Sequence, residues 1–265
     1  MFKINDKILH IEHFPDGTLR LNLAVDSDEV MIQWLFEETE EMILFFVVNH
    51  LKERYAVKHI TLDMPYIPHA RMDRVKNQQE VFTLKYFCEF INALNFDKVF
   101  VRDAHSNVAL GLIDRVVSQP IDGTIKGLTK ELLDAEYDII FYPDEGSCKR
   151  YAEVTNFPCA FGIKKRDWST GEILGLDVHG NVPKAPFDVL IVDDISSFGG
   201  TFLHSARKLK ELGADKIYLY VTHCENSILK GDLINSGLLT KIYTTQSIFT
   251  EEHPLIEVMG GNGYE

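Results

Sequence analysis

The chain has 265 residues, of which 45% are hydrophobic and 25% are charged, a balance typical of folded globular proteins and not of disordered chains. Its 40 acidic residues outnumber its 27 basic ones, and the net charge of −13 disfavours nucleic acid as a partner. The longest apolar run, residues 42–48, is well short of the roughly 20 residues that a membrane-spanning helix needs, so we expect no membrane partner.

The N-terminal residues, Met1 to His10, mix charged side chains with apolar ones and so do not have the unbroken apolar stretch of a secretory signal. The cysteines have no paired spacing, which argues against a disulfide framework and against a cysteine zinc site. They are Cys88, Cys148, Cys159 and Cys224. We therefore expect a cytoplasmic protein with reduced cysteines.

Short apolar runs, typical of buried strands, alternate along the chain with segments that have helical spacing. In chain order, the expected strands are residues 60–63, 99–103, 137–142, 187–193 and 216–221. Apolar residues recur every three or four positions in 80–94, between the first two strands, and in 201–212, between the last two. This alternation predicts an α/β fold with mainly parallel sheets and helices packed against them.

Polar side chains stand at the ends of several expected strands, in both halves of the chain. They include Asp103, His105, Asp144, Asp193 and His223. Ligands of open α/β sheets bind at the carboxyl ends of the strands, so these side chains are candidates for a functional site. Because both halves have this build, we predict two domains, residues 1–135 and 136–265, with the boundary near Ala135.

The strongest local signal is the segment 189–202, in which a buried strand leads into two carboxylates, a glycine turn and a helix. Asp193 and Asp194 can accept hydrogen bonds from the neighbouring hydroxyls of a ribose. Gly199 and Gly200 allow a phosphate close to the backbone, and the first N–H groups of the following helix attract its charge. An ordinary strand end with a glycine turn is the structural alternative, but the doubled carboxylate with Gly-Gly-Thr favours a ribose-phosphate site.

This segment resembles the phosphoribosyl-diphosphate binding loop that type I phosphoribosyltransferases share with ribose-phosphate pyrophosphokinases. Further blocks are similar to the second family alone and occur in its order: PYIPHARMDR at 65–74, DAH at 103–105, PDEGSCKR at 143–150 and KKR at 164–166. The resemblance implies an α/β fold of two tandem type I phosphoribosyltransferase-like domains, each a mainly parallel sheet flanked by helices. The N-terminal domain would bind the nucleotide, and the C-terminal domain the ribose phosphate.

The activity that the resemblance implies is a Mg²⁺-dependent diphosphoryl transfer. The anomeric hydroxyl of a ribose 5-phosphate unit attacks the β-phosphorus of ATP, and AMP leaves. Such transfers need in-line positioning and neutralisation of charge, which Lys164 and Arg166 would supply as the catalytic residues. His105 and Asp144 would hold Mg²⁺. A core histidine at position 105 and a surface basic run at 164–166 are the structural alternatives.

Residues in both halves would bind the substrates. By the same resemblance, the ATP-binding residues are Phe14, Asp16, Arg71, Asp73 and His105. The ribose-phosphate-binding residues are Asp193, Asp194, Ser197, Phe198, Gly199, Gly200 and Thr201. Phe14 matches an aromatic residue that stacks on the adenine of a neighbouring subunit, so we expect a homo-oligomer, either a dimer or a hexamer. A simple core or hairpin residue is the alternative for Phe14.

The chain departs from the family pattern inside the ribose-phosphate loop. Ser197 stands where the family has an acid, and Phe198 replaces a hydroxyl residue that helps to hold the 5-phosphate. These changes leave the acceptor open between ribose 5-phosphate and a modified 5-phosphate such as ADP-ribose, on which a branch of the family acts. Two other hypotheses stay open: a type I phosphoribosyltransferase, which shares only the 193–201 loop, and a non-catalytic regulatory relative.

Overall fold

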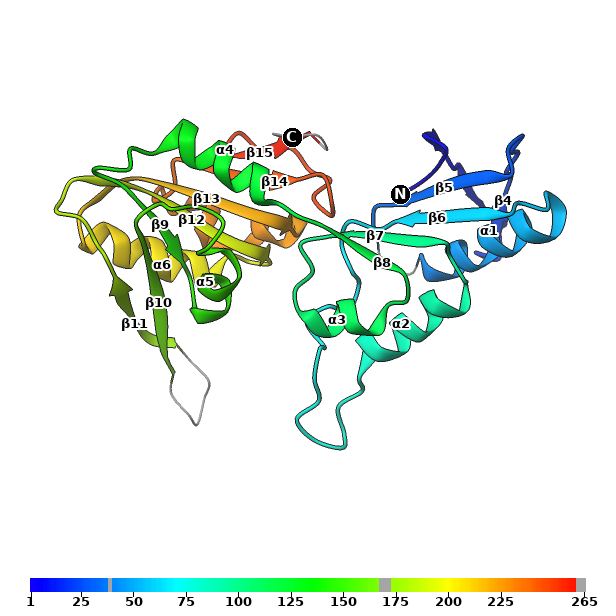
Figure 1. The fold of residues 1–265 in the computed structure, drawn as a ribbon, viewed down its shortest axis with the longest axis horizontal. Coiled ribbons are helices and arrows are strands. Elements are labelled where there is room, and N and C mark those ends of the chain that lie inside the picture. The colour runs from blue at the N-terminus through cyan, green and yellow to red at the C-terminus, as the bar shows by residue number, and fades with distance from the viewer. Residues whose placement is uncertain (38–39, 167–172, 261–265) are drawn as a thin grey trace. The chain divides into compact units, whose positions relative to one another are not determined.

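The computed structural model describes residues 1–37, 40–166 and 173–260, with the backbone alone for 164–166, 173 and 174. This part of the chain forms two compact units, unit 1 from Met1 to Pro120 and unit 2 from Ile121 onward (Figure 1). Each unit contains one large sheet with its own helices, so the predicted α/β fold with mainly parallel sheets is confirmed. Across the described ranges, no helix is long and apolar enough to cross a membrane.

Unit 1 is built on a six-stranded sheet in the order β2-β1-β5-β6-β7-β8. Its parallel strands are β5 (Glu29–Trp34), β6 (His59–Asp63), β7 (Lys98–Arg102) and β8 (Val116–Gln119). The antiparallel edge consists of β1 (Phe2–Ile4) and β2 (Lys7–Ile8). Three helices cover one face of this sheet in Figure 1: α1 (Glu41–Arg54), α2 (Thr83–Ala93) and α3 (Asn107–Leu112).

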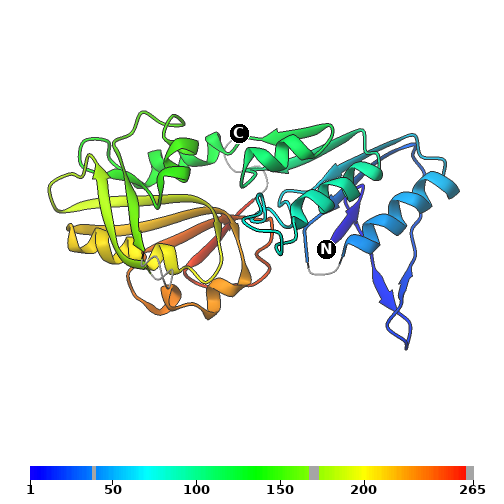
Figure 2. The ribbon, with the colours of Figure 1, turned by 90° about the horizontal axis from the view of Figure 1, so that it is seen from below.

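A hairpin in unit 1 forms a separate two-stranded sheet. Its strands are β3 (Ile11–His13) and β4 (Leu19–Leu21), which pair in antiparallel register. Figure 2 shows this hairpin extending away from the six-stranded sheet. Its turn, which contains Phe14, therefore lies apart from the core of the unit.

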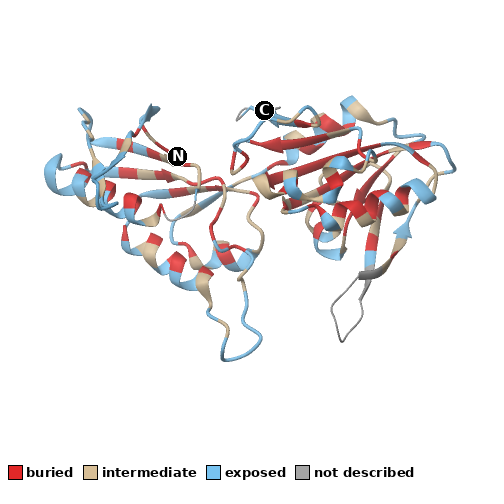
Figure 3. Cartoon of the chain, turned by 180° about the vertical axis from the view of Figure 1, so that it is seen from behind, coloured by how far each residue is buried: buried red, intermediate tan, exposed pale blue. Residues whose placement is uncertain are grey.

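Unit 2 contains a seven-stranded sheet in the order β11-β10-β9-β12-β13-β14-β15, parallel except where β11 pairs with β10. The strands are β9 (Ile139–Tyr142), β10 (Cys159–Arg166), β11 (Ile173–Gly180), β12 (Phe187–Ser196), β13 (Ala214–Cys224), β14 (Lys241–Thr245) and β15 (Ile256–Met259). The central strands β9, β12 and β13 are largely buried (Figure 3), as expected for a parallel sheet covered on both faces.

Helices cover both faces of the unit 2 sheet. Successive β12 side chains point to opposite faces, so alternate residues of this strand pack in two different cores. On one face, α6 (Gly200–Glu211) shares a core with Ile191. On the other face, α4 (Asp122–Leu132) and α5 (Glu145–Tyr151) share a core with Leu190. Two short helices follow β13: η1 (Asn226–Lys230) and α7 (Asp232–Asn235).

The division between the units falls between Pro120 and Ile121, earlier than the boundary near Ala135 that the sequence suggested. The helix α4 accounts for the difference, since Ile125 and Leu128 are buried in the core of unit 2. An amphipathic pattern indicates which face of a helix is buried but not which sheet covers it. The assignment of α4 therefore depended on tertiary packing.

Candidate functional site

Asp144, two residues after the end of β9, is the N-cap of the helix α5. Its Oδ1 accepts hydrogen bonds from the backbone N–H groups of Gly146, at 3.0 Å, and Ser147, at 3.1 Å. The backbone N–H of Asp144 donates in return to the Ser147 hydroxyl at 3.4 Å, which completes a capping box. The cap fixes this carboxylate at the carboxyl end of the sheet, where ligands bind in α/β folds.

Asp193 and Asp194 lie on the neighbouring strand β12. The two strands pair in parallel with Ile191 opposite Phe141, so the β12 carboxylates come level with the residues just after β9. Asp194 is buried, and its Oδ2 lies 3.4 Å from Nη1 of Arg150 on α5. The backbone N–H of Asp194 donates to Asp193 Oδ1 at 3.0 Å. Tertiary pairing therefore gathers the predicted carboxylates of unit 2 at one edge.

The electrostatics of this edge raise the proton affinity of Asp193. Burial, followed by the negative charges of Asp194 and Asp144, raises the pKa of Asp193 well above its ordinary value. Arg150 forms an ion pair with one of these carboxylates, Asp194. The cluster therefore favours a ligand that contributes hydroxyl donors or a cation, and the oxygen donors suit a hydrated Mg²⁺ shared with phosphate groups. In the part of the chain with described side chains, no group of three or more metal-ligating residues is already assembled.

The loop between β12 and α6 has the conformation of an anion-binding turn. Gly199 adopts a φ of +80°, and a Cβ atom there would lie 2.7 Å from Cδ2 of Leu233, so both the turn and the close contact favour glycine. Helix α6 begins at Gly200 without a side-chain cap, which leaves its first N–H groups for a ligand. The ring of Phe198 beside this turn is 57% exposed.

The segment after β13 packs against this loop. The N–H of Glu225 donates to the Ser196 carbonyl at 2.9 Å. Gly231 approaches so closely that a Cβ atom there would lie 1.8 Å from the carbonyl oxygen of Phe198. Residues 225–231 were not predicted as part of the site, because a single glycine in a polar stretch was the only sequence signal.

Replacing Gly231 with alanine is expected to destabilise unit 2, because the obstructing Phe198 atom belongs to the backbone and cannot rotate away. We expect the free energy of unfolding, measured in urea, to fall by about 2–4 kcal/mol. Gly111→Ala is the control, since nothing lies within 4 Å of an added Cβ on α3. That variant should be neutral or slightly stabilised. Equal stability of the two variants would contradict the close contact at Gly231.

Unit 1 places two predicted site residues just beyond β7. Asp103 is buried and has a φ of +42°, a left-handed conformation that non-glycine residues adopt rarely and often at functional sites. His105, two residues later, is partly exposed. On the neighbouring strand β6, burial raises the pKa of Asp63, and its Oδ1 is buried without a hydrogen-bond partner. The carboxyl ends of β6 and β7 are therefore polar, as the sequence predicted for β7.

The predicted nucleotide-binding residues Arg71 and Asp73 lie in the loop between β6 and α2. Arg71 is exposed, whereas Asp73 is partly buried with its Oδ1 3.5 Å from Nε of Arg74. His105 and these two residues belong to unit 1, and Asp144 belongs to unit 2. A shared magnesium site of His105 and Asp144 stays a prediction.

The turn of the β3–β4 hairpin carries the remaining predicted nucleotide contacts. Asp16 Oδ1 accepts from the Thr18 N–H at 2.9 Å and from the Thr18 hydroxyl at 2.7 Å, which orders the turn. Phe14, also in this turn, is 50% exposed. Phe14 is therefore not a core residue, and its ring is accessible for contact with another molecule.

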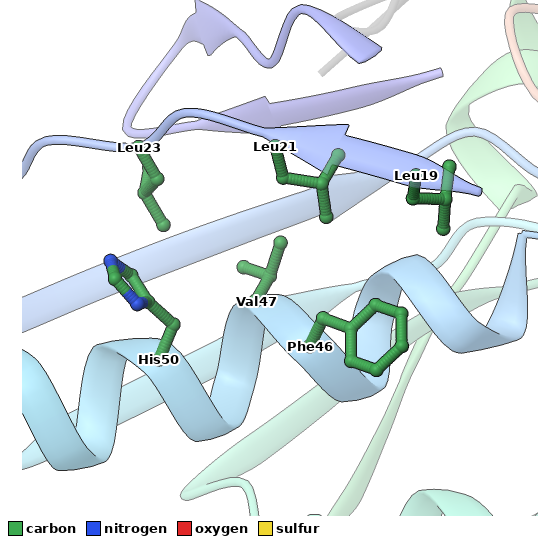
Figure 4. Close-up of a pocket in the computed structure, with 6 residues that line it drawn as sticks. All are labelled: Leu19, Leu21, Leu23, Phe46, Val47 and His50. Carbon is green, nitrogen blue, oxygen red and sulfur yellow. The ribbon is translucent and has the colours of Figure 1, made fainter. Parts of the chain in front are cut away.

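A pocket of about 250 Å³ lies between the β4 segment and α1 in unit 1 (Figure 4). It is lined by Leu19, Leu21, Leu23, Phe46, Val47 and His50. The lining contains no carboxylate and none of the predicted site residues. The pocket therefore does not coincide with the polar strand ends described above.

The two predicted catalytic residues lie at the end of β10. The backbone of Lys164 pairs with Leu176, and that of Arg166 with Ile173, with an irregularity in the register just before Arg166. The side chains of Lys164 and Arg166 lie outside what the structure describes. Their catalytic role stays a prediction.

Comparison with known proteins identifies relatives over most of the chain. No protein-family model matches. The chain is 30% identical to the ribose-phosphate pyrophosphokinase of Sulfurisphaera tokodaii over 263 residues, which cover 92% of this chain and 87% of that protein. It is 27% identical to the Bacillus subtilis ribose-phosphate pyrophosphokinase over 256 residues, with 93% and 79% covered. The chain is also 27% identical to ribose-phosphate pyrophosphokinase 2 from rice chloroplasts, and it spans 62% of the length of that protein.

A solved structure has the same fold as this chain. The phosphoribosylpyrophosphate synthetase of Mycobacterium smegmatis superposes with a TM-score of 0.77, covering 96% of this chain and 86% of that one at 21% sequence identity. At this identity the likeness concerns the arrangement of strands and helices. The two-sheet α/β architecture is thus shared over nearly the whole chain.

Proposed function

Because the chain belongs to the ribose-phosphate pyrophosphokinase family, we propose that it transfers the β,γ-diphosphoryl group of ATP to the anomeric hydroxyl of a ribose 5-phosphate unit and releases AMP. The observation that carries this proposal is the cluster of Asp144, Asp193 and Asp194, together with the uncapped start of α6, which follows Asp193 and Asp194 in the chain. The cluster would accept hydrogen bonds from sugar hydroxyls, and the helix start would donate to a phosphate, as a ribose phosphate requires.

In the proposed reaction, the anomeric oxygen forms a bond to the β-phosphorus of ATP. The bond from that phosphorus to the oxygen shared with the α-phosphate breaks, its electron pair leaves with AMP, and the proton of the anomeric hydroxyl passes to solvent. Asp193 and Asp194 would orient the ribose hydroxyls, and the backbone N–H groups at the start of α6 would hold the 5-phosphate. Lys164 and Arg166 would stabilise the charge on the transferring group.

Mg²⁺ is the cofactor that this chemistry implies, and when bound it neutralises the phosphates of ATP. Asp144 and His105 are the proposed protein ligands. The cap on α5 supports this role for Asp144, because it orients the carboxylate before a ligand arrives. Water and phosphate oxygens would complete the coordination, as is usual for Mg²⁺.

ATP would bind through Phe14, Asp16, Arg71, Asp73 and His105. The exposure of Phe14 at a hairpin turn supports the proposal that its ring stacks on adenine bound to a neighbouring subunit. This arrangement requires a homo-oligomer, a dimer or a hexamer.

The acceptor is proposed to be ribose 5-phosphate or a modified 5-phosphate such as ADP-ribose. The exposed ring of Phe198 supports the modified acceptor, because it offers a stacking surface where a hydroxyl would grip a terminal phosphate.

An acceptor panel tests the proposed function and separates the two acceptors. Incubation with ATP, MgCl₂ and either ribose 5-phosphate or ADP-ribose should release AMP in proportion to acceptor. Mass spectrometry should show an acceptor heavier by one diphosphate group. ATP with MgCl₂ alone is the control. Absence of acceptor-dependent AMP release would contradict the proposal and favour a non-catalytic relative, whereas base-dependent release of pyrophosphate from phosphoribosyl diphosphate would indicate a phosphoribosyltransferase.

A further inference from the structure

The hydroxyl of Ser197, in the loop before α6, is linked by hydrogen bonds through Ser227 to the carboxylate of Glu225. The Ser227 hydroxyl donates to Oε2 of Glu225 at 2.9 Å. Oγ of Ser197 lies 3.3 Å from Oγ of Ser227. All three residues are partly buried. These hydrogen bonds therefore connect the proposed ligand loop with η1.

The number of protons available shows which group donates in each of these hydrogen bonds. A carboxylate accepts hydrogen bonds only, whereas a serine hydroxyl has a single proton to donate. Because the proton of Ser227 is donated to Glu225, the contact between the two serines uses the proton of Ser197. Ser197 then presents only lone pairs to a ligand on the loop.

The position of Glu225 and Ser227 is itself fixed. The N–H of Glu225 donates to the Ser196 carbonyl at 2.9 Å, directly beside Ser197. On the other side, the Asn226 side chain donates to the Thr250 hydroxyl at 2.7 Å and accepts from the Thr250 N–H at 3.0 Å. The orientation of Ser197 is thus established before a ligand binds, which lowers the entropic cost of binding.

We propose that Glu225 and Ser227 are positioning residues that make Ser197 a hydrogen-bond acceptor, so that Ser197 selects a sugar hydroxyl and gives no hydrogen bond to a phosphate. The proposal rests on the proposed function, in which this loop binds a ribose phosphate. In this arrangement the neutral hydroxyl of Ser197 only accepts hydrogen bonds from a ligand, as a carboxylate does. It adds no charge to an edge that already contains Asp144, Asp193 and Asp194.

Titration calorimetry with the full chain tests this assignment, with ribose 5-phosphate and inorganic phosphate as probes at pH 8 without metal. Ser197→Ala should weaken ribose 5-phosphate about 5-fold and leave the Kd of inorganic phosphate unchanged. Ser227→Ala frees the Ser197 proton, so inorganic phosphate should bind about 3-fold or more tightly. Ser227→Thr, which retains the hydroxyl, should keep the original values. The gain should disappear in the double variant Ser197→Ala/Ser227→Ala.

Two results would overturn the proposal, and each is decisive alone should one variant fail to fold. One is an equal weakening of both probes by Ser197→Ala, which would make Ser197 a phosphate donor. The other is an unchanged ratio of the two Kd values in Ser227→Ala. Failure of the original chain to bind either probe is a separate result, which contradicts the proposed function as well.

Discussion

Replacing Lys164 with alanine is expected to lower kcat by at least about 100-fold, with a much smaller change in the KM for ATP. Diphosphoryl transfer needs positive charge against the transferring group, and the loss of one such contact in a transition state has this magnitude. A contact made only in the transition state affects kcat more than KM. The measurement is the initial rate of acceptor-dependent AMP release at saturating substrates.

Lys165→Ala is the matched control for this prediction. It removes the same charge from the adjacent residue of β10, which is not one of the two predicted catalytic residues. We expect its kcat to stay within about 3-fold of the original. If Lys164→Ala turned over normally, the catalytic role of this segment would be wrong, and a regulatory role for the protein would gain support.

Replacing Asp193 with asparagine is expected to weaken binding of the ribose acceptor and yet stabilise the free protein. Losing a charged acceptor for sugar hydroxyls should raise the KM for the acceptor about 10- to 100-fold. The free energy of unfolding should nevertheless increase, because burial and the charges of Asp194 and Asp144 disfavour the charged form of Asp193 and so raise its pKa. Asparagine keeps the oxygen that accepts from the Asp194 N–H but has no charge to bury.

The sign of the stability effect depends on pH. A carboxyl group whose pKa is raised in the folded state stabilises the fold at low pH, and this contribution is lost as pH rises through the raised pKa. The variant should therefore melt at least about 2 °C above the original protein at pH 8, and the difference should vanish towards pH 3. Differential scanning calorimetry across this range provides the measurement.

Asp188→Asn provides the control on the same strand. Asp188 accepts from the Lys216 N–H at 2.9 Å and lies 3.5 Å from Lys216 Nζ, so its charge is stabilised by a partner. Loss of the Asp188 charge in this variant should leave Tm unchanged or lower it at pH 8. A fall in Tm for Asp193→Asn as well would show that the charge of Asp193 stabilises the fold.

Much of the architecture followed from local patterns. The runs at 60–63, 99–103, 137–142, 187–193 and 216–221 all lie in or overlap strands of the structure. The strands β9, β12 and β13 are largely buried, and burial of both faces produces continuous apolar runs that are visible in sequence. In β6 and β7 buried residues alternate with less buried ones. Short strands such as β8 and β15 were missed, because four residues with partly exposed faces have no comparable pattern.

The candidate site was predictable to the extent that its residues are adjacent in the chain. Asp193, Asp194, Gly199 and Gly200 form one contiguous motif, and the structure arranges them as a strand end, a left-handed turn and a helix start. The ion pair of Arg150 with Asp194 and the packing of Gly231 on Phe198 were not predicted. Both join residues that are distant in sequence, where periodicity carries no information.

The amino-acid sequence by itself determined the fold class, the position of the ribose-phosphate loop and the resemblance to a family, because strand runs, turn glycines and motif spacing depend on neighbouring residues. The tertiary structure decided that α4 belongs to unit 2, that Phe14 is exposed, that burial and the charges of Asp194 and Asp144 raise the pKa of Asp193, and that Glu225 orients Ser197 through Ser227. Packing, burial and the direction of a hydrogen bond arise between distant segments, so they exist only once the chain has folded.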